Sequence, residues 1–158
     1  MASPLSYRGY DRRMAVERME HVGIVVDDLA AAVAFFVALG LELDGETSVE
    51  GEVVDRMTGL EGVRSDLAFL QTPDGHGKVE VVQYRSPARA GDPEPPRPNT
   101  PGLNHLLFAV DDVEATLARL LTHGAELVGE VIDYGTSYRL CYLRGPGRMI
   151  IELAEKLD

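Results

Sequence analysis

The sequence predicts an α+β fold of two tandem βαβββ modules, whose curved and mostly antiparallel sheets enclose a cleft. The first observation is an internal repeat: residues 19–43 align with residues 103–127 at an offset of 84 without a gap, and 9 of the 25 positions are identical. The second observation is that both copies show the same order of strand, helix and strand signals. The third is a proline-rich stretch between the copies. A duplicated unit of this kind indicates that the fold contains the same structural module twice.

Each copy begins with a strand followed by a helix. Residues 22–26 form a short apolar run rich in β-branched side chains, which is typical of a buried strand. Asp28 follows, and aspartate is a favourable N-cap for the helix expected over residues 30–39. Gly40 is placed to end this helix because glycine takes positive φ angles readily, and a second strand is expected directly after it. The second copy repeats the series as strand 106–110, helix 114–123 and Gly124.

Each copy then continues with a hairpin of two strands. In the first copy, the Pro-Asp-Gly turn at residues 73–75 joins strands expected at residues 66–71 and 78–84. The second copy has a Gly-Pro-Gly turn. In both copies the last glycine of the turn lies five residues before a glutamate. The first copy is longer because residues 50–62 are inserted, with a short helix expected near residues 52–58. The corresponding elements of the second copy are the turn 145–147 and the strands 138–144 and 148–154.

The repeat and the composition between the copies set the expected boundaries. We expect a flexible N-terminal arm at residues 1–16, a first module at 17–85, a linker at 86–101 and a second module at 102–158. The linker contains six prolines and few apolar residues, so it should be extended. Its length permits the two modules to pair within one chain or to exchange between two chains. The arm should be poorly ordered or pack against a partner subunit.

The composition argues against several classes of partner. A formal net charge of −11 disfavours nucleic acid and anionic membrane surfaces. No apolar run approaches the roughly 20 residues that span a bilayer, and the N-terminal stretch lacks the apolar core of a secretory signal. The single cysteine, Cys141, cannot form an internal disulfide and should pack as a small apolar residue. These features predict a cytoplasmic protein that acts on a small molecule.

The repeat also duplicates two residue types that bind metals. One histidine stands at the first strand of each copy and one glutamate in the last strand, which gives the set His21, Glu80, His105 and Glu152. A single glutamate in a strand usually faces solvent. The same two types at equivalent positions of both copies instead favour a shared site, because charged groups in apolar strands are normally paired or metal-bound. Two imidazoles and two carboxylates suit one divalent ion such as Zn²⁺, Ni²⁺, Co²⁺, Mn²⁺ or Fe²⁺.

Four motifs carry a resemblance to a known family. They are EHVGIVVDDL at 20–29, KVEVVQY at 78–84, GLNHLLFAVDDVE at 102–114 and GRMIIELAE at 147–155. Over nearly the whole chain the sequence resembles the vicinal oxygen chelate (VOC) superfamily, which includes glyoxalase I, methylmalonyl-CoA epimerase, extradiol dioxygenases and the bleomycin and fosfomycin resistance proteins. The resemblance implies a glyoxalase-like fold, one divalent metal ion and a homodimer. Carried over residue by residue, the implied ligands are His21, Glu80, His105 and Glu152.

The resemblance implies a metal-dependent lyase or isomerase that stabilises an enolate, with Glu152 or Glu80 as the base. Glu80 matches the glyoxalase pattern, since epimerases often carry glutamine there, and Asn104 stands where epimerases usually carry histidine. An extradiol-type dioxygenase, which needs only His21, His105 and Glu152, and a non-catalytic drug-binding protein remain alternatives. The absence of tryptophan and the 6% aromatic content argue against a stacking pocket of the drug-binding kind. Candidate substrate-binding residues are Tyr134, Tyr138, Arg139 and Arg56.

Overall fold

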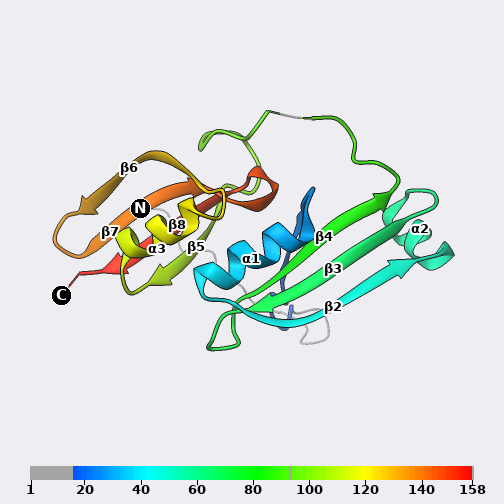
Figure 1. The fold of residues 1–158 in the computed structure, drawn as a ribbon, viewed down its shortest axis with the longest axis horizontal. Helices are drawn as coiled ribbons and strands as arrows, with labels where there is room; N and C mark the ends of the chain where they lie inside the picture. Colours follow the sequence, from blue (N-terminus) through cyan, green and yellow to red (C-terminus); the bar gives the residue numbers. More distant parts are fainter. Residues whose placement is uncertain (1–15, 93, 158) are drawn as a thin grey trace, which may run out of the picture.

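The computed structural model describes residues 16–92 and 94–157 and contains two four-stranded sheets, each with its own crossover helix (Figure 1). The elements of the first module are β1 (Val22–Val25), α1 (Leu29–Leu39), β2 (Glu42–Glu50), α2 (Glu52–Thr58), β3 (Arg64–Gln71) and β4 (Lys78–Ser86). Those of the second are β5 (His105–Val110), α3 (Val113–Leu121), β6 (Glu126–Tyr134), β7 (Tyr138–Arg144), the 3₁₀ turn η2 (Pro146–Arg148) and β8 (Ile150–Lys156). The arm expected at residues 1–16 lies outside the described residues except for Val16.

The two sheets have the same topology, which confirms the tandem βαβββ fold. Their strand orders are β1-β4-β3-β2 and β5-β8-β7-β6. The first strand of each module pairs in parallel with the last, and the other pairs are antiparallel. The crossover helix carries the chain from the first strand to the opposite edge of the sheet, and the antiparallel strands that follow bring the last strand back beside the first.

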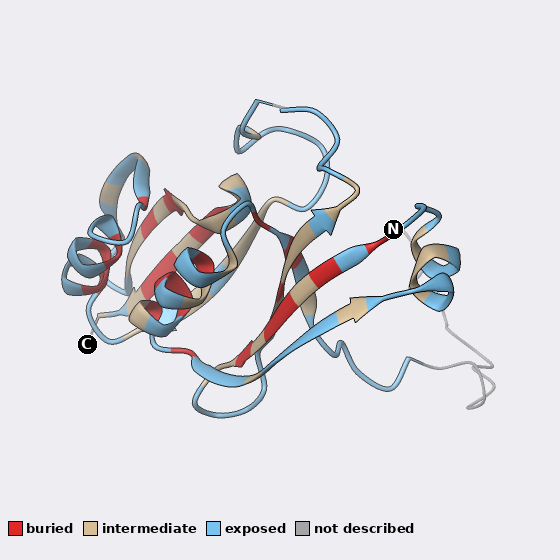
Figure 2. Cartoon of the chain, turned by 45° about the vertical axis from the view of Figure 1, so that its right-hand side comes forward, coloured by how far each residue is buried: buried red, intermediate tan, exposed pale blue. Residues whose placement is uncertain are grey.

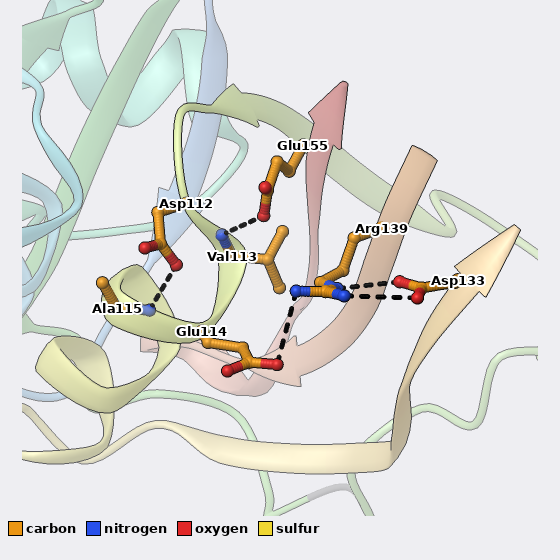
Figure 3. Close-up of polar contacts among 7 residues, drawn as sticks. All are labelled: Asp112, Val113, Glu114, Ala115, Asp133, Arg139 and Glu155. Carbon is orange, nitrogen blue, oxygen red and sulfur yellow. Dashed lines mark hydrogen bonds and ion pairs between the residues drawn. The ribbon is translucent and has the colours of Figure 1, made fainter. Parts of the chain in front are cut away.

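Aspartate caps start both crossover helices. The Asp28 carboxylate accepts a hydrogen bond from the Ala31 amide at 2.9 Å, and Asp112 accepts one from Ala115 at 2.8 Å (Figure 3). Helix α1 ends at Gly40, whose φ of 119° places it in the left-handed region. Helix α3 ends earlier than the pattern predicts, because Thr122 caps it in the right-handed conformation and its hydroxyl donates to the Arg119 carbonyl.

A second acceptor ties each helix to the last strand of its module. The Gln83 side-chain oxygen accepts from the Leu29 amide at 3.1 Å, and the Glu155 carboxylate accepts from Val113 at 2.9 Å (Figure 3). Gln83 and Glu155 each lie three residues after a candidate metal ligand. Since side chains alternate along a strand, the ligand glutamates point to the face of the sheet away from the helix.

One continuous apolar core joins the two modules. Helix α1 contacts its own sheet and also helix α3, and the Arg119 guanidinium donates to the Ala38 carbonyl at 2.6 Å. Figure 2 shows the buried residues concentrated in the strands and on one side of the helices. Fully buried side chains from both modules include Phe35, Phe36, Leu120, Leu143, Ile151 and Leu153. We call the opposite side of each sheet, which carries no helix, its open face.

None of the helices in the described ranges 16–92 and 94–157 combines the length and apolar composition that a bilayer crossing requires.

Candidate metal centre

The first module holds His21 against Glu80. His21 directly precedes β1, and the register of β1 with β4 places Gly23 opposite Glu80. The neighbours of Glu80 in β4, Val79 and Val81, are buried toward the helix, so Glu80 points to the open face. His21 Nε2 lies 3.1 Å from Glu80 Oε2 across the two strands.

The second module builds the same pair from equivalent positions. His105 is the first residue of β5, and Leu107 lies opposite Glu152 on β8. Ile151 and Leu153, on either side of Glu152, are fully buried. His105 Nε2 lies 2.8 Å from Glu152 Oε2, and the side chain of Glu152 is only 12% exposed. Each sheet therefore presents one imidazole nitrogen and one carboxylate oxygen together on its open face.

An aromatic ring from the third strand of each sheet lies beside each histidine. Phe69 is opposite Glu80 in the register and contacts the His21 ring edge-on, with centroids 6.5 Å apart. Tyr142 is opposite Glu152, and its ring centroid lies 5.2 Å from that of His105. Burial and, to a smaller extent, the Glu152 carboxylate raise the pKa of Tyr142. The Tyr142 hydroxyl therefore stays protonated to a higher pH than an ordinary tyrosine.

Asn104 sets the orientation of the His105 ring. Its Nδ2 donates to the Pro98 carbonyl, so its Oδ1 faces His105 Nδ1 at 2.6 Å. An amide oxygen only accepts, so Nδ1 is the ring nitrogen that donates to Asn104, and Nε2 is the one that faces the Glu152 carboxylate. An unprotonated Nε2 and a carboxylate oxygen both accept, so at 2.8 Å the His105 and Glu152 atoms need a proton or a cation between them. Metal-bound histidines characteristically donate their second N–H to an oxygen in this way, so the donor set of this module fits a metal ion.

The structure keeps the two histidine–glutamate pairs apart. Among the residues it describes, no three histidine, cysteine, aspartate or glutamate side chains converge as a metal-binding group. Each module of a single chain thus supplies two candidate ligands, and the four-ligand centre stays a prediction.

Two of the candidate substrate-binding residues lie on the same face as Glu152. Tyr134 pairs with Tyr138 across the β6–β7 hairpin. Tyr138 and Tyr142 are four residues apart on one strand, so they share a face, and Tyr142 is opposite Glu152. Tyr134 and Tyr138 therefore belong to the open face of the second sheet.

The two arginines lie elsewhere. Arg139 points to the helix side, where it binds Asp133 at 2.7 Å and Glu114 of α3 at 3.5 Å (Figure 3). Its hydrogen bond holds the pKa of Asp133 below the ordinary value. Arg56 is exposed on α2, which contacts β2, the strand at the far edge of the first sheet from β1. The structure therefore brings neither guanidinium to a histidine–glutamate pair, and it gives Arg139 a role in fixing the hairpin to α3.

A hollow of about 500 Å³, which the sequence had not led us to expect, lies on the open face of the second sheet. Glu152 and Tyr138 are both among the residues that line it. The lining residues that we did not foresee include Leu107, Leu140 and Lys156. The sequence did contain a signal for them. Side chains two residues apart on a strand share a face, and each of these positions is an even number of residues from His105, Tyr138 or Glu152. The hollow is apolar, with a carboxylate and an ammonium group in its lining.

The fold and the repeated pairs define a protein of two βαβββ modules with one histidine–glutamate pair on the open face of each. Residues 20–142 match the family model described as Glyoxalase/Bleomycin resistance protein/Dioxygenase superfamily, and the chain belongs to this superfamily. Members of the superfamily commonly bind a divalent metal ion.

Several individual proteins are similar to this chain. A glyoxalase family protein from Bacillus cereus is 41% identical, with a TM-score of 0.87 and coverage of 93% of this chain and 99% of its own. The uncharacterized protein YaeR of Escherichia coli is 28% identical over 144 residues, which is 90% of this chain and 99% of YaeR. The fosfomycin resistance protein FosX of Listeria monocytogenes, solved with Mn(II) and sulfate, is 17% identical with a TM-score of 0.56, covering 89% and 93%. At that identity FosX shows a shared fold alone.

Proposed function

We propose that this protein is a metal-dependent lyase or isomerase of the glyoxalase I or methylmalonyl-CoA epimerase type, acting on a small carbonyl compound through its enolate. The observation that carries the proposal is the repeated pairing of imidazole Nε2 with carboxylate oxygen, at 3.1 Å in the first module and 2.8 Å in the second. The apolar hollow that Glu152 borders supports it, because such a pocket can hold a small carbonyl compound beside the carboxylate.

The residues that would hold the ion are His21, Glu80, His105 and Glu152. When bound, the ion supplies Lewis-acid stabilisation of negative charge on the substrate oxygen. Glu152 is the candidate base, because its carboxylate borders the hollow from which a substrate carbon would approach. It would take the proton from the carbon next to the carbonyl and return it to the same or the adjacent carbon. Glu80 is the alternative base.

Other side chains have simpler roles in this proposal. The Tyr142 hydroxyl lies 3.4 Å from His105 Nδ1 and can donate a hydrogen bond beside the reacting group. Leu107 and Leu140 would exclude water from the substrate. The Lys156 ammonium, in the same lining, would favour a substrate that carries an anionic group.

The test measures metal content and proton exchange together. Purified protein is loaded with Co²⁺, Ni²⁺, Zn²⁺ or Mn²⁺ and analysed for bound metal. Loaded protein is then incubated in D₂O with a 2-oxoaldehyde hemithioacetal or a 2-methylmalonyl thioester, and deuterium at the carbon next to the carbonyl is followed by NMR. Glu80→Ala and Glu152→Ala should lose metal and exchange, whereas Glu46→Ala and Glu126→Ala, at exposed strand positions, should keep both. Unchanged metal content in Glu80→Ala and Glu152→Ala would contradict the proposal.

A non-catalytic binding protein is the second candidate, and the apolar lining of the hollow is the observation that favours it. Tight binding of an apolar compound by metal-free protein, without deuterium exchange, would support that function. The dioxygenase alternative needs three ligands, so Glu80 would be surplus. Oxygen uptake with catechols would identify it.

A further inference from the structure

We propose that Arg144 is a positioning residue of the candidate metal centre. Its guanidinium holds the linker at Pro96, and through the linker it fixes the side-chain amide of Asn104 beside His105. The inference rests on the proposed function, since it concerns the metal affinity of the same centre. It gives the segment between the two modules a task beyond joining them.

Arg144 is the last residue of β7 and lies on the open face of the second sheet. It is two residues after Tyr142, so the two side chains share a face, and Tyr142 is opposite Glu152. Its Nη1 donates to the Pro96 carbonyl at 2.9 Å and to the Arg148 carbonyl at 3.4 Å. A guanidinium presents several N–H donors in one rigid plane, so this side chain can hold the linker against the end of β7.

Pro96 is the point at which the linker leaves solvent. Among the described residues between 88 and 103, it alone is not exposed. A short turn follows it: the Arg97 amide donates to the Thr100 hydroxyl at 2.9 Å, and the Thr100 amide donates to the Arg97 carbonyl at 2.9 Å. Pro98 lies inside this turn, and its ring fixes its φ angle. Because the turn is stiff, holding Pro96 also sets the direction of the Pro98 carbonyl.

The Pro98 carbonyl decides which way the Asn104 amide points. It accepts a hydrogen bond from Asn104 Nδ2, and the other end of the amide, Oδ1, lies 2.6 Å from His105 Nδ1. Without an acceptor at Nδ2, the amide would be free to rotate, and its oxygen would not stay against the ring. An oxygen acceptor at the second ring nitrogen fixes the orientation of a metal-binding histidine and raises its basicity. Arg144 is thereby linked to His105 through two carbonyls and one amide.

Arg144 has no counterpart in the first module. It lies eight residues before Glu152, and the residue eight before Glu80 is Thr72. The Thr72 hydroxyl accepts from the Gly77 amide at 2.9 Å, within its own hairpin turn. The hydrogen bond from β7 to the linker is therefore an addition to the repeated plan, as expected of a contact that serves one histidine only.

The test measures cobalt(II) affinity in a double-mutant cycle of Arg144→Met and Asn104→Leu, by competition with a chromophoric chelator. Arg144→Met should weaken binding by about 10-fold, the lower end of the losses seen when outer hydrogen-bond partners are removed. In the Asn104→Leu background, Arg144→Met should cause no further loss, because the amide through which it acts is gone. Losses that multiply in the double variant, or an unchanged affinity in Arg144→Met, would overturn the inference.

Two further variants separate positioning from general damage to the strand. Arg144→Lys keeps an N–H donor for the Pro96 carbonyl and should recover most of the affinity. Arg139→Met removes a guanidinium from the same strand, but one whose partners, Asp133 and Glu114, lie on the helix side. It should bind cobalt(II) as wild type does. An equal loss in Arg139→Met would assign the effect to a weakened β7 and would also overturn the inference.

A measurement on metal-free protein tests the amide itself. The side-chain NH₂ resonances of Asn104, assigned by their absence in Asn104→Leu, report its motion through the heteronuclear NOE. This NOE should be high in wild type and in Arg139→Met, and in Arg144→Met it should fall toward that of Asn99, the exposed second asparagine of the chain. An unchanged NOE in Arg144→Met would contradict the inference and leave the proposed function in place. Wild-type protein that binds no cobalt(II) would remove both together.

Discussion

The side chains of His105 and Asn104, which are adjacent in sequence, are hydrogen-bonded to each other, with Nδ1 of the ring 2.6 Å from Oδ1 of the amide. The equivalent residue in the first module is Glu20, whose carboxylate is engaged by Arg18 and Lys78. The two halves of the candidate centre therefore differ in how their histidines are oriented. In the second module an oxygen acceptor lies against His105 Nδ1, while Nε2 faces Glu152.

We expect Asn104→Leu to weaken metal binding by about 10- to 100-fold, because the acceptor that fixes the His105 ring is lost. Asn104→Asp retains an oxygen acceptor and should restore most of the affinity. Glu20→Leu, at the equivalent position, should have little effect. Competition with a chromophoric chelator measures the three affinities. Equal losses in Asn104→Leu and Asn104→Asp would show that the acceptor is unimportant.

Tyr142→Phe should lower turnover about 10- to 100-fold without changing metal content, because it removes a hydrogen-bond donor beside the reacting group. Burial raises the pKa of this hydroxyl, so its donor form persists above the pH at which an ordinary tyrosine ionises. The wild-type rate should accordingly hold further into the alkaline range. Bound metal, measured in the same samples, is the control for an intact centre. A pH–rate profile that is identical in Tyr142→Phe and wild type would exclude this role.

Glu155→Ala should destabilise the fold by about 1 kcal/mol, because the Val113 amide at the start of α3 loses its acceptor. Glu155→Gln should retain most of the stability, since Gln83 performs the same task for α1. Urea unfolding followed by circular dichroism gives both free energies of unfolding. If the Glu155→Ala and Glu155→Gln proteins had equal free energies of unfolding, the hydrogen bond from the Val113 amide to residue 155 would contribute nothing to stability.

Gly145→Ala should cost about 1–3 kcal/mol, because the new methyl group would collide with Ile151 and press on Phe35 in a core that is already filled. Gly45→Ala is the matched control: no atom lies within 4 Å of its added Cβ, and its φ is not positive. Thermal unfolding of the two variants compares them directly. A Gly145→Ala protein as stable as Gly45→Ala would mean that the modules are not tightly joined at η2.

The repeat predicted the fold because each copy repeats its own local signals, and those signals describe elements within one module. The pairing of His21 with Glu80 also follows from one module, since first and last strands are parallel neighbours. The relation between the two modules could not be predicted, because it depends on the fit of Gly145 against Phe35, more than 100 residues apart. The face of the sheet on which Arg139 lies could not be predicted from the sequence either, because it depends on the register of the β6–β7 hairpin.

Side chains of β8 alternate between the two faces of its sheet, and the two sets have different roles. Ile151 and Leu153 maintain the scaffold, while Glu152, Ala154 and Lys156 border the hollow. Substitutions at Ala154 and Lys156 can change the shape and charge presented to a small molecule without disturbing the packing beneath. A strand built in this way allows new ligand preferences to arise on an unaltered framework, as expected of a superfamily that includes glyoxalases, resistance proteins and dioxygenases.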